Sequence, residues 1–398
     1  MANTSTFKAL LVADGSGGHL IPAFQAAGGL AGRGARVKVW YPHRRTTAPL
    51  ADALREQMQQ EGVDVEPFSV GAAPRPWTRL WGSAQLWQQA LRCFETFAPD
   101  VVVGFGGWVS APVIVAARHR RIPVVLHEQN VVLGRANRWL ARYANQVAVS
   151  FAETQAQLGR VPSVVTGLPI RRPIGRTARA QAAARLGLHP EPLTLLVLGG
   201  SQGARPLNRL LTGLAALCSP EERQTWQVVH VTGASDDATV RRVYAAYGMR
   251  AWVGPFLAGM EDAYAVADVA IARAGASTIA ELACCGVPAV LIPYPHAGGH
   301  QRMNAGAVET LGGGIVIEES EATPEGVLSA VRRLLTDERL RHMMGAQMRR
   351  LHAADAAERL ADAILGAGRA HAPRAVPVVS PGDPKTRPTP LTAHAHKR

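Results

Sequence analysis

The sequence predicts an α/β protein of two domains, each with a mostly parallel sheet and helices on both faces. Three observations support this prediction. Short strands of buried character alternate with helical patterns along most of the chain. A glycine-rich turn joins a strand to a helix once in each half, at residues 15–18 and 199–204. Between the halves, Gly167-Leu-Pro-Ile-Arg-Arg-Pro173 interrupts the alternation and is the best candidate linker.

The strand patterns divide into two series. The first lies near residues 9–13, 36–40, 64–68, 101–103, 124–127, 147–150 and 163–166, and the second near 194–198, 227–231, 250–253, 269–272, 289–292 and 314–317. Helical patterns fill the intervals and dominate after Thr323. We therefore expect an N-terminal domain over residues 1–168 and a C-terminal domain over 169–350. A helix at 351–368 is expected to pack back on the N-terminal domain, and 369–398 to form a disordered basic tail.

Composition indicates a soluble globular protein. The chain has 398 residues, which is enough for two domains with full cores. Of these residues 47% are hydrophobic, and the mean hydropathy is +0.01. The long uncharged stretch at 101–117 contains glycines and a proline and is not expected to span a membrane. The N-terminus has no basic region typical of a signal peptide. The four cysteines lack metal-ligand spacing, which favours a reduced, cytoplasmic setting.

The formal net charge of +13 is concentrated in the first half and the tail. Such a charge attracts nucleic acid, anionic lipid headgroups and phosphorylated substrates alike. Charge alone does not select among these partners.

The two glycine-rich turns are candidate anion sites, because each aims backbone N–H groups and a helix N-terminus at one point. The first turn leads directly to His19 on the first helical turn, where a neutral imidazole can act as a general base near pH 7. A histidine that only caps the helix or bonds locally is the alternative. The second turn includes Ser201, whose hydroxyl adds a donor. It matches neither a Walker A loop nor a dinucleotide fingerprint.

Polar or glycine-rich segments follow two further strands of the first half. Gly104-Phe-Gly-Gly107 admits a close ligand or simply makes a tight turn. His127-Glu-Gln-Asn130 places four polar side chains at the end of a strand. These side chains suit the recognition of sugar hydroxyls, and a solvated loop is the alternative.

In the second half, Thr278 and Glu281 share one face of a helix start. A carboxylate at this position suits a ribose diol. Ordinary capping by Ser277 or Thr278 is the alternative. A loop rich in proline and glycine then ends at His300 and Gln301, which suit a sugar. We do not expect a metal site there, because the glycines argue against a helix and no nearby carboxylate completes the ligand set.

A tryptophan- and arginine-rich segment precedes residue 100. It includes Trp77, Arg79, Leu80 and Trp81. Tryptophan beside arginine is typical of a membrane interface, whereas an aromatic stripe at helical spacing is also typical of a core.

Together these motifs resemble the MurG family of UDP-N-acetylglucosamine transferases, which complete lipid II for bacterial peptidoglycan. The matching runs span residues 8 to about 316 and are Gly15-Ser-Gly-Gly-His19, Gly104-Phe-Gly-Gly-Trp-Val-Ser110, His127-Glu-Gln-Asn130, Gly199-Gly-Ser-Gln-Gly-Ala-Arg205 with Leu207-Asn208, Arg273-Ala-Gly-Ala-Ser-Thr-Ile-Ala-Glu281, and His300-Gln301 with Asn304-Ala305. The resemblance implies the GT-B fold, two Rossmann-like domains facing across a cleft. It also implies an inverting transfer from UDP-N-acetylglucosamine to the 4-hydroxyl of undecaprenyl-diphosphate-linked N-acetylmuramyl-pentapeptide (lipid I).

The resemblance also assigns residues. His19 would be the catalytic base, and Ser16, Gly17, Gly18 and Asn130 would face the cleft from the acceptor side. Donor binding would involve Ser201 at the pyrophosphate, Glu281 at the ribose, Leu257 at the uracil through its backbone, and Arg171 at the nucleotide. Donor binding would extend over the helix start, Ala276, Ser277, Thr278, Ile279 and Ala280, and over His300 and Gln301 at the sugar. No metal or cofactor is implied. The first loop departs from the family pattern at Asp14 and Ser16, and the sugar loop departs at Gly298-Gly299.

A lipid diphosphate acceptor favours the membrane-interface interpretation of the tryptophan- and arginine-rich segment. We expect the N-terminal half to dock on an anionic membrane surface at the cytoplasmic face of the bacterial inner membrane, and we expect no nucleic-acid partner. The nearest alternatives are a diacylglycerol glycosyltransferase or a nucleotide-sugar epimerase of the same fold. A non-catalytic sugar-binding protein and a nicotinamide-dependent dehydrogenase are further alternatives, and the missing Gly-x-Gly-x-x-Gly disfavours the dehydrogenase.

Overall fold

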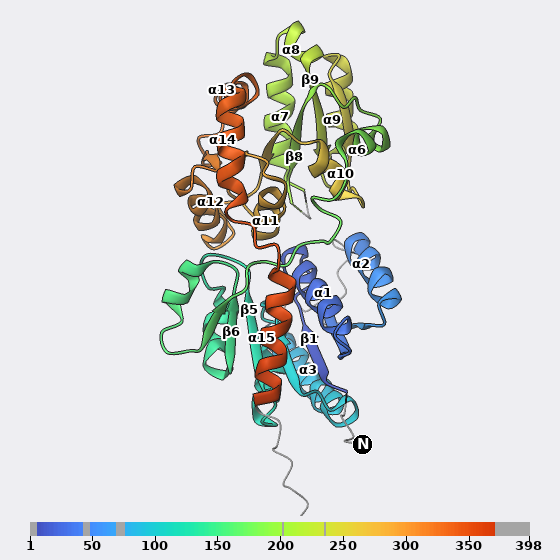
Figure 1. Ribbon diagram of the computed structural model, residues 1–398, viewed down its shortest axis with the longest axis vertical. Coiled ribbons are helices and arrows are strands. Elements are labelled where there is room, and N and C mark those ends of the chain that lie inside the picture. The colour runs from blue at the N-terminus through green and yellow to red at the C-terminus, as the bar shows by residue number, and fades with distance from the viewer. Residues whose placement is uncertain (1–5, 43–47, 69–75, 201–202, 235, 371–398) are drawn as a thin grey trace, which may run out of the picture.

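The computed structural model describes residues 6–42, 48–68, 76–200, 203–234 and 236–370. The chain folds into two α/β units that lie one above the other along the long axis in Figure 1. The N-terminal unit is the lower one and the C-terminal unit the upper one. The segment after β7 passes between them.

The N-terminal unit contains a seven-stranded sheet in the order β3-β2-β1-β4-β5-β6-β7. Its strands are β1 (Lys8–Val12), β2 (Arg36–Pro42), β3 (Asp64–Phe68), β4 (Val101–Gly104), β5 (Val124–Glu128), β6 (Gln146–Val149) and β7 (Ser163–Val165). The helices that connect them are α1 (Gly17–Ala31), α2 (Ala48–Gln60), α3 (Pro76–Phe97), α4 (Ser110–His119) and α5 (Arg135–Leu140), with short 3₁₀ turns η2 (Ala141–Tyr143) and η3 (Ala152–Gln157).

The C-terminal unit contains a six-stranded sheet in the order β10-β9-β8-β11-β12-β13. Its strands are β8 (Leu193–Leu198), β9 (Trp226–Val231), β10 (Arg250–Gly254), β11 (Val269–Ala272), β12 (Ala289–Leu291) and β13 (Gly314–Val316). The helices that follow β7 are α6 (Arg179–Leu186), α7 (Arg205–Leu217), α8 (Pro220–Thr225), α9 (Asp237–Ala246), α10 (Met260–Val266), α11 (Ala276–Cys285), α12 (His300–Thr310), α13 (Pro324–Thr336), α14 (Glu338–Arg349) and α15 (Ala356–Ala370).

The expected α/β class with two parallel sheets is confirmed. Each strand range expected from the sequence overlaps a strand of the structure, and the strand pairings in both sheets are parallel. Strand order reverses between β1 and β4 in the first sheet and between β8 and β11 in the second. In open parallel sheets ligands bind at the carboxyl ends of the strands beside such a reversal.

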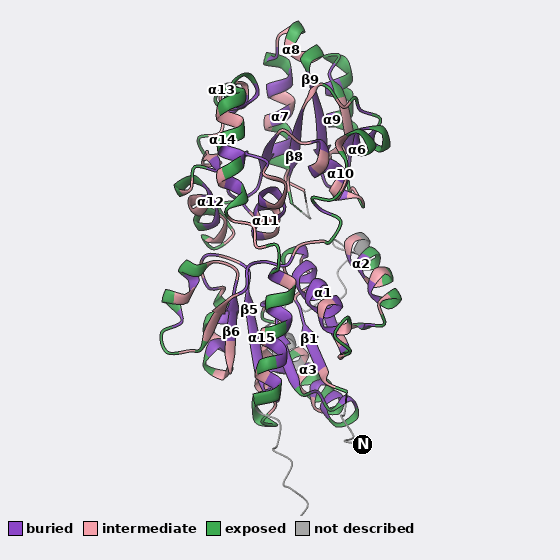
Figure 2. Ribbon diagram, viewed as in Figure 1, coloured by how far each residue is buried: buried purple, intermediate pink, exposed green. Residues whose placement is uncertain are grey.

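The central strands of both sheets are buried on both faces, which explains their continuous apolar sequences (Figure 2). In β1, Ala9 and Leu11 pack on one side with α1, α2 and α15, whereas Leu10 and Val12 pack on the other side with α3 and α4. This alternation follows from the two-residue repeat of a strand. The second sheet is covered in the same way, by α6, α10, α11 and α12 on one face and by α7, α9, α13 and α14 on the other.

The last helix of the described residues, α15, returns to the N-terminal unit. It packs along α1 and against β4, β5 and β6, and it is the red helix that runs down the lower unit in Figure 1. Leu360, Ala361 and Ile364 are fully buried in the core there. Gly368 lies so close to the Phe7 ring that an added Cβ would approach it to 2.6 Å.

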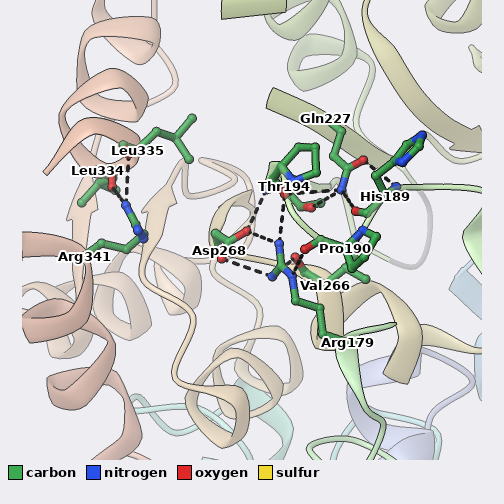
Figure 3. A network of polar contacts seen from close by, with 11 residues as sticks. Arg179, His189, Pro190, Thr194, Gln227, Val266, Asp268, Leu334, Leu335 and Arg341 are labelled. Carbon is green, nitrogen blue, oxygen red and sulfur yellow. Dashed lines mark hydrogen bonds and ion pairs between the residues drawn. The ribbon is translucent and has the colours of Figure 1, made fainter. Parts of the chain in front are cut away.

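A polar network braces the amino ends of the second sheet (Figure 3). Arg179 donates to both carboxylate oxygens of Asp268 and to the carbonyl oxygens of Pro190 and Val266. Asp268 also accepts from the backbone of Thr194, whose hydroxyl accepts from Gln227. The network lies at the opposite end of the sheet from the carboxyl ends of the strands, so we interpret it as a structural brace.

Candidate active site

A cavity of about 450 Å³ lies between the two units, at the carboxyl ends of both sheets. It is lined from below by the start of α1 and the segment after β5. From above it is lined by the turn after β8, the segment after β10, the start of α11 and the start of α12. Two points of strand reversal therefore face one cavity, as expected for a ligand bound between two Rossmann-like halves.

His19 lies in this cavity with Ser16, Gly17 and Gly18. The Ser16 hydroxyl is 2.8 Å from His19 Nδ1. Ser16 is the N-cap of α1, but its side chain makes no capping bond, so its hydroxyl serves the histidine instead. This contact helps to fix the orientation of the imidazole ring.

The Gly104–Gly107 segment makes a tight turn against the first loop. Gly106 and Gly107 have φ of +89° and +78°, which favour glycine. A Cβ on Gly106 would lie 2.9 Å from His19 Nε2, and one on Gly107 would lie 2.5 Å from Asp14 Cβ. Asp14 therefore faces Gly107, and it is not among the residues that line the cavity.

The His127–Asn130 segment is not a solvated loop, because His127, Glu128 and Gln129 are buried. Glu128 accepts from the backbone of Asn130 and of Gly134, and from the side chains of Asn130 and Asn137. Burial lowers the pKa of His127 to about 4, so this ring is neutral near pH 7. The interpretation of all four side chains as sugar ligands is wrong: only Gln129 and Asn130 reach the cavity.

A residue of the upper unit orients Asn130. Asn304 is fully buried and donates to Asn130 Oδ1 and to the carbonyl of Ala274, at 3.0 and 3.1 Å. It also accepts from the backbone N–H of Val131 at 3.0 Å. Nearby, His300 Nδ1 is 3.2 Å from the carbonyl of Val132. The cleft is thus bridged by direct hydrogen bonds beside the cavity.

The start of α11 forms the upper wall. Ala276, Ser277, Thr278 and Glu281 line the cavity. The N-cap of this helix is Gly275, with no capping side chain, so the capping alternative is wrong. Among the described residues, Ser277 Oγ is buried without a hydrogen-bond partner. Two of the expected positions do not line the cavity: Ile279, which is buried in the core, and Ala280.

Glu281 is held from two sides. Arg171, in the segment between the units, donates from Nε and Nη2 to Oε1 at 3.0 and 2.9 Å. The Tyr264 hydroxyl donates to Oε2 at 2.7 Å. Burial acts to lower the pKa of Arg171, but the adjacent Glu281 charge keeps that pKa above its ordinary value. Burial raises the pKa of Tyr264 well above its ordinary value, so the phenol stays protonated and its hydroxyl donates the hydrogen bond to Glu281.

The remaining expected donor residues surround this pair. Leu257, His300 and Gln301 line the cavity, together with Gly199 and Gly200 of the second glycine-rich turn. Gln301 Oε1 accepts from the backbone of Tyr294, which leaves its amide N–H groups available. Ser201 lies outside the described residues.

The tryptophan- and arginine-rich segment lies at the start of α3. The side chains of Trp77, Arg79, Leu80 and Trp81 are outside the described part of the structure. A separate aromatic group was not singled out from the sequence. It consists of Trp108, which is 54% exposed, Trp139 and Tyr143, with the Arg142 guanidinium 5.1 Å from the Trp139 ring.

In the described part of the chain, no helix is long and apolar enough to cross a membrane. Among the same residues, no group of three or more His, Cys, Asp or Glu side chains is placed to hold a metal ion.

Comparison with known families matches both halves of the chain. The glycosyltransferase family 28 N-terminal domain matches residues 9–149, and the family 28 C-terminal domain matches residues 194–360.

Curated relatives match over most of their length. A protein of Rhodospirillum centenum is 38% identical over 362 residues, covering 90% of this chain and 94% of the relative. One of Mesorhizobium japonicum is 36% identical over 357 residues, covering 89% and 93%. Both are named UDP-N-acetylglucosamine–N-acetylmuramyl-(pentapeptide) pyrophosphoryl-undecaprenol N-acetylglucosamine transferase.

Solved structures give the same picture of the fold. The crystal structure of Acinetobacter baumannii MurG superposes with a TM-score of 0.69 at 28% identity, covering 90% of this chain and 99% of that one. A UDP-GlcNAc 2-epimerase from Neisseria meningitidis superposes with a TM-score of 0.66 at 12% identity, covering 90% and 100%, which speaks to the fold alone.

Proposed function

Since this chain belongs to glycosyltransferase family 28, we propose that its cleft transfers N-acetylglucosamine from UDP-N-acetylglucosamine to the 4-hydroxyl of lipid I. The product is lipid II, an intermediate of peptidoglycan synthesis. The fold is the GT-B arrangement of two Rossmann-like units. In this proposal residues 1–168 form the acceptor domain and residues 169–350 the donor domain. Residues 351–368 return to the acceptor domain.

One observation carries the proposal. A single cavity joins His19 and Asn130 of one unit to Glu281, His300 and Gln301 of the other. A transferase needs a base on the acceptor side and nucleotide-sugar ligands on the donor side, within reach of one reacting carbon. A volume of about 450 Å³ is in the range of small-molecule sites.

Donor recognition follows from the upper wall. Glu281 accepts from the ribose, and the backbone of Leu257 meets the uracil. The diphosphate lies at the start of α11, near Arg171, where Ser277 Oγ offers an unused hydroxyl, and at the second glycine-rich turn with Ser201. Gln301 and His300 contact the sugar.

The chemistry is a direct displacement at the anomeric carbon. The acceptor 4-hydroxyl gives its proton to His19 Nε2 while its oxygen attacks that carbon, and the bond to the diphosphate oxygen breaks. UDP leaves with the bonding electron pair, stabilised by backbone N–H groups and helix N-termini. Ser16, bonded to Nδ1, keeps the ring in the required orientation. Attack from the face opposite the leaving group inverts the configuration.

UDP release tests the acceptor. We expect rapid release from UDP-N-acetylglucosamine with a muramyl-diphosphate lipid and only background release with diacylglycerol or with no acceptor. Release that requires diacylglycerol would contradict the proposal. Tight donor binding with no release under any condition would favour a non-catalytic sugar-binding protein.

Replacing His19 by alanine tests the base. Turnover is expected to fall by about a hundredfold or more, because proton transfer by a positioned base contributes roughly that factor. The affinity for UDP-N-acetylglucosamine, measured by calorimetry, is expected to stay near the wild-type value. Wild-type turnover in His19→Ala would remove the base assignment.

We further propose that the N-terminal unit docks on anionic membrane at the cytoplasmic face of the bacterial inner membrane. Support comes from the basic excess in the first half and from exposed Trp108, grouped with Trp139, Tyr143 and Arg142. Trp77, Arg79, Leu80 and Trp81 are the expected contact residues.

The docking proposal is tested with Trp81→Glu and sedimentation on vesicles that contain anionic lipid. We expect weaker sedimentation with unchanged turnover on a short-chain soluble acceptor. Loss of soluble expression instead would show that Trp81 belongs to the core.

A further inference from the structure

We propose that Tyr264 is a positioning residue for nucleotide recognition, because its hydroxyl fixes the carboxylate of Glu281 for the ribose. The inference rests on the proposed function, in which Glu281 is the ribose ligand. Tyr264 belongs to none of the motifs singled out in the sequence.

The hydrogen bonds to Glu281 define the plane of its carboxylate. Arg171 donates two N–H groups to Oε1 and none to Oε2. Bonds to one oxygen alone leave the carboxylate free to rotate about that contact. The bond from Tyr264 to Oε2, at 2.7 Å, supplies the second fixed point. A carboxylate has about four acceptor positions, so with three donors already bound about one position on Oε2 remains for a ribose hydroxyl.

Core packing holds the Tyr264 hydroxyl in place. The side chain is 2% exposed, and its ring packs in the core with Met260, Ile279 and Leu282. The same residue also lines the cavity, so its hydroxyl lies where the core meets the site. A donor placed by a packed core keeps its position before and after ligand binding, which is the requirement for pre-organised recognition.

Tyr244 provides a matched control within the same unit. It is also 2% exposed, and its hydroxyl is 2.9 Å from His230 Nδ1. It packs in the core on the other face of the sheet and does not line the cavity. Removing either hydroxyl takes one oxygen from a buried polar pair, and the melting temperatures of the two variants report how far their folding costs differ. Only Tyr264 contacts a proposed ligand-binding group.

The experiment compares UDP with 2′,3′-dideoxy-UDP as calorimetric ligands for the wild type, Tyr264→Phe, Tyr244→Phe and Glu281→Ala. The wild type is expected to prefer UDP. Tyr264→Phe is expected to bind UDP about tenfold more weakly, because the Glu281 carboxylate is no longer fixed in place for the ribose before UDP binds, while its affinity for the dideoxy nucleotide changes little. The preference for UDP therefore shrinks in Tyr264→Phe and stays unchanged in Tyr244→Phe. Melting temperatures measured alongside report the folding cost of each variant.

The outcomes separate this inference from the proposed function. If Glu281→Ala abolishes the preference for UDP and Tyr264→Phe keeps it in full, Tyr264 is only structural and the inference is overturned. If Glu281→Ala keeps the preference, the ribose assignment in the proposed function is wrong. Equal loss of preference in both tyrosine variants would show a general loosening of the unit and would also overturn the inference.

Discussion

Because Gly106 has no side chain, it leaves space for the His19 ring in the cleft. Its φ of +89° is unfavourable for a side chain, and an added Cβ would lie 2.9 Å from His19 Nε2. The atom that would clash is the one that takes the proton in the proposed displacement. The position of the proposed base, His19, therefore depends on a glycine at position 106, although 87 positions separate the two residues in the chain.

Gly106→Ala tests this coupling. We expect turnover to fall at least tenfold, because a displaced base loses much of its contribution, while the affinity for UDP-N-acetylglucosamine is unchanged. Gly159→Ala is the control, since Gly159 also has positive φ (+58°) but nothing lies within 4 Å of its added Cβ. A similar loss of turnover in both variants would show that general destabilisation, and not the contact with His19, is responsible.

The sequence predicts the surroundings of some residues at the cavity but not those of others. Glu281 and Gln301 were foreseeable, because glycine-rich segments precede polar side chains at the ends of strands. For Glu128 the sequence leaves sugar recognition and a solvated loop open, whereas the structure shows it accepting four hydrogen bonds from the loop that follows and from Asn137 of α5. Tyr264 was missed because a tyrosine on an apolar helix face is typical of a core, and its partner lies 17 residues away on another helix.

Among the elements, α15 connects the end of the second unit to the core of the first. It follows all the strands of the second sheet, yet it completes the core of the first through Leu360, Ala361 and Ile364. The strands were predictable because burial on both faces produces continuous apolar runs. The expectation that residues 351–368 pack back on the N-terminal domain does not follow from helical periodicity, because the sheet that an amphipathic helix covers depends on tertiary packing.

Leu360→Ala tests the contribution of α15. Removing a fully buried leucine side chain leaves a cavity and is expected to lower the free energy of unfolding by about 2–5 kcal/mol. Chemical denaturation measures this change. Glu358→Ala, at an exposed position of the same helix, is expected to stay within about 0.5 kcal/mol of the wild type. Equal values for the two variants would show that α15 does not stabilise the fold.

In the whole molecule, the two units line one cavity together, and direct hydrogen bonds join them beside it. Asn304 of the upper unit bonds Asn130 and Val131 of the lower one, and Arg171 of the connecting segment bonds Glu281. Each unit also has a fully buried neutral histidine away from solvent. Burial lowers the pKa of His127 to about 4 and that of His230 to about 3, from an ordinary 6.5.

These two histidines predict an acid-sensitive fold. Below pH 6.5 the unfolded chain binds protons that the folded chain excludes, so stability is present in full above pH 6.5 and falls as the pH drops toward 4. Each histidine contributes a slope of about 1.4 kcal/mol per pH unit in that window. Urea denaturation of His230→Gln between pH 7 and 5 is expected to show a smaller slope than the wild type. An unchanged slope would mean that His230 titrates normally in the folded protein.

Analysis of the reaction product is the sharpest test of the proposed transfer of N-acetylglucosamine to lipid I. The protein is incubated with UDP-N-acetylglucosamine and a muramyl-diphosphate lipid, and the extracted lipid is analysed by mass spectrometry and NMR. We expect one added N-acetylglucosamine on the muramyl 4-oxygen, in the β configuration opposite to that of the donor. A product in which the anomeric configuration of the donor is retained would contradict a direct displacement with His19 as the base. An unmodified lipid, under conditions where the donor binds, would contradict the proposed transfer itself.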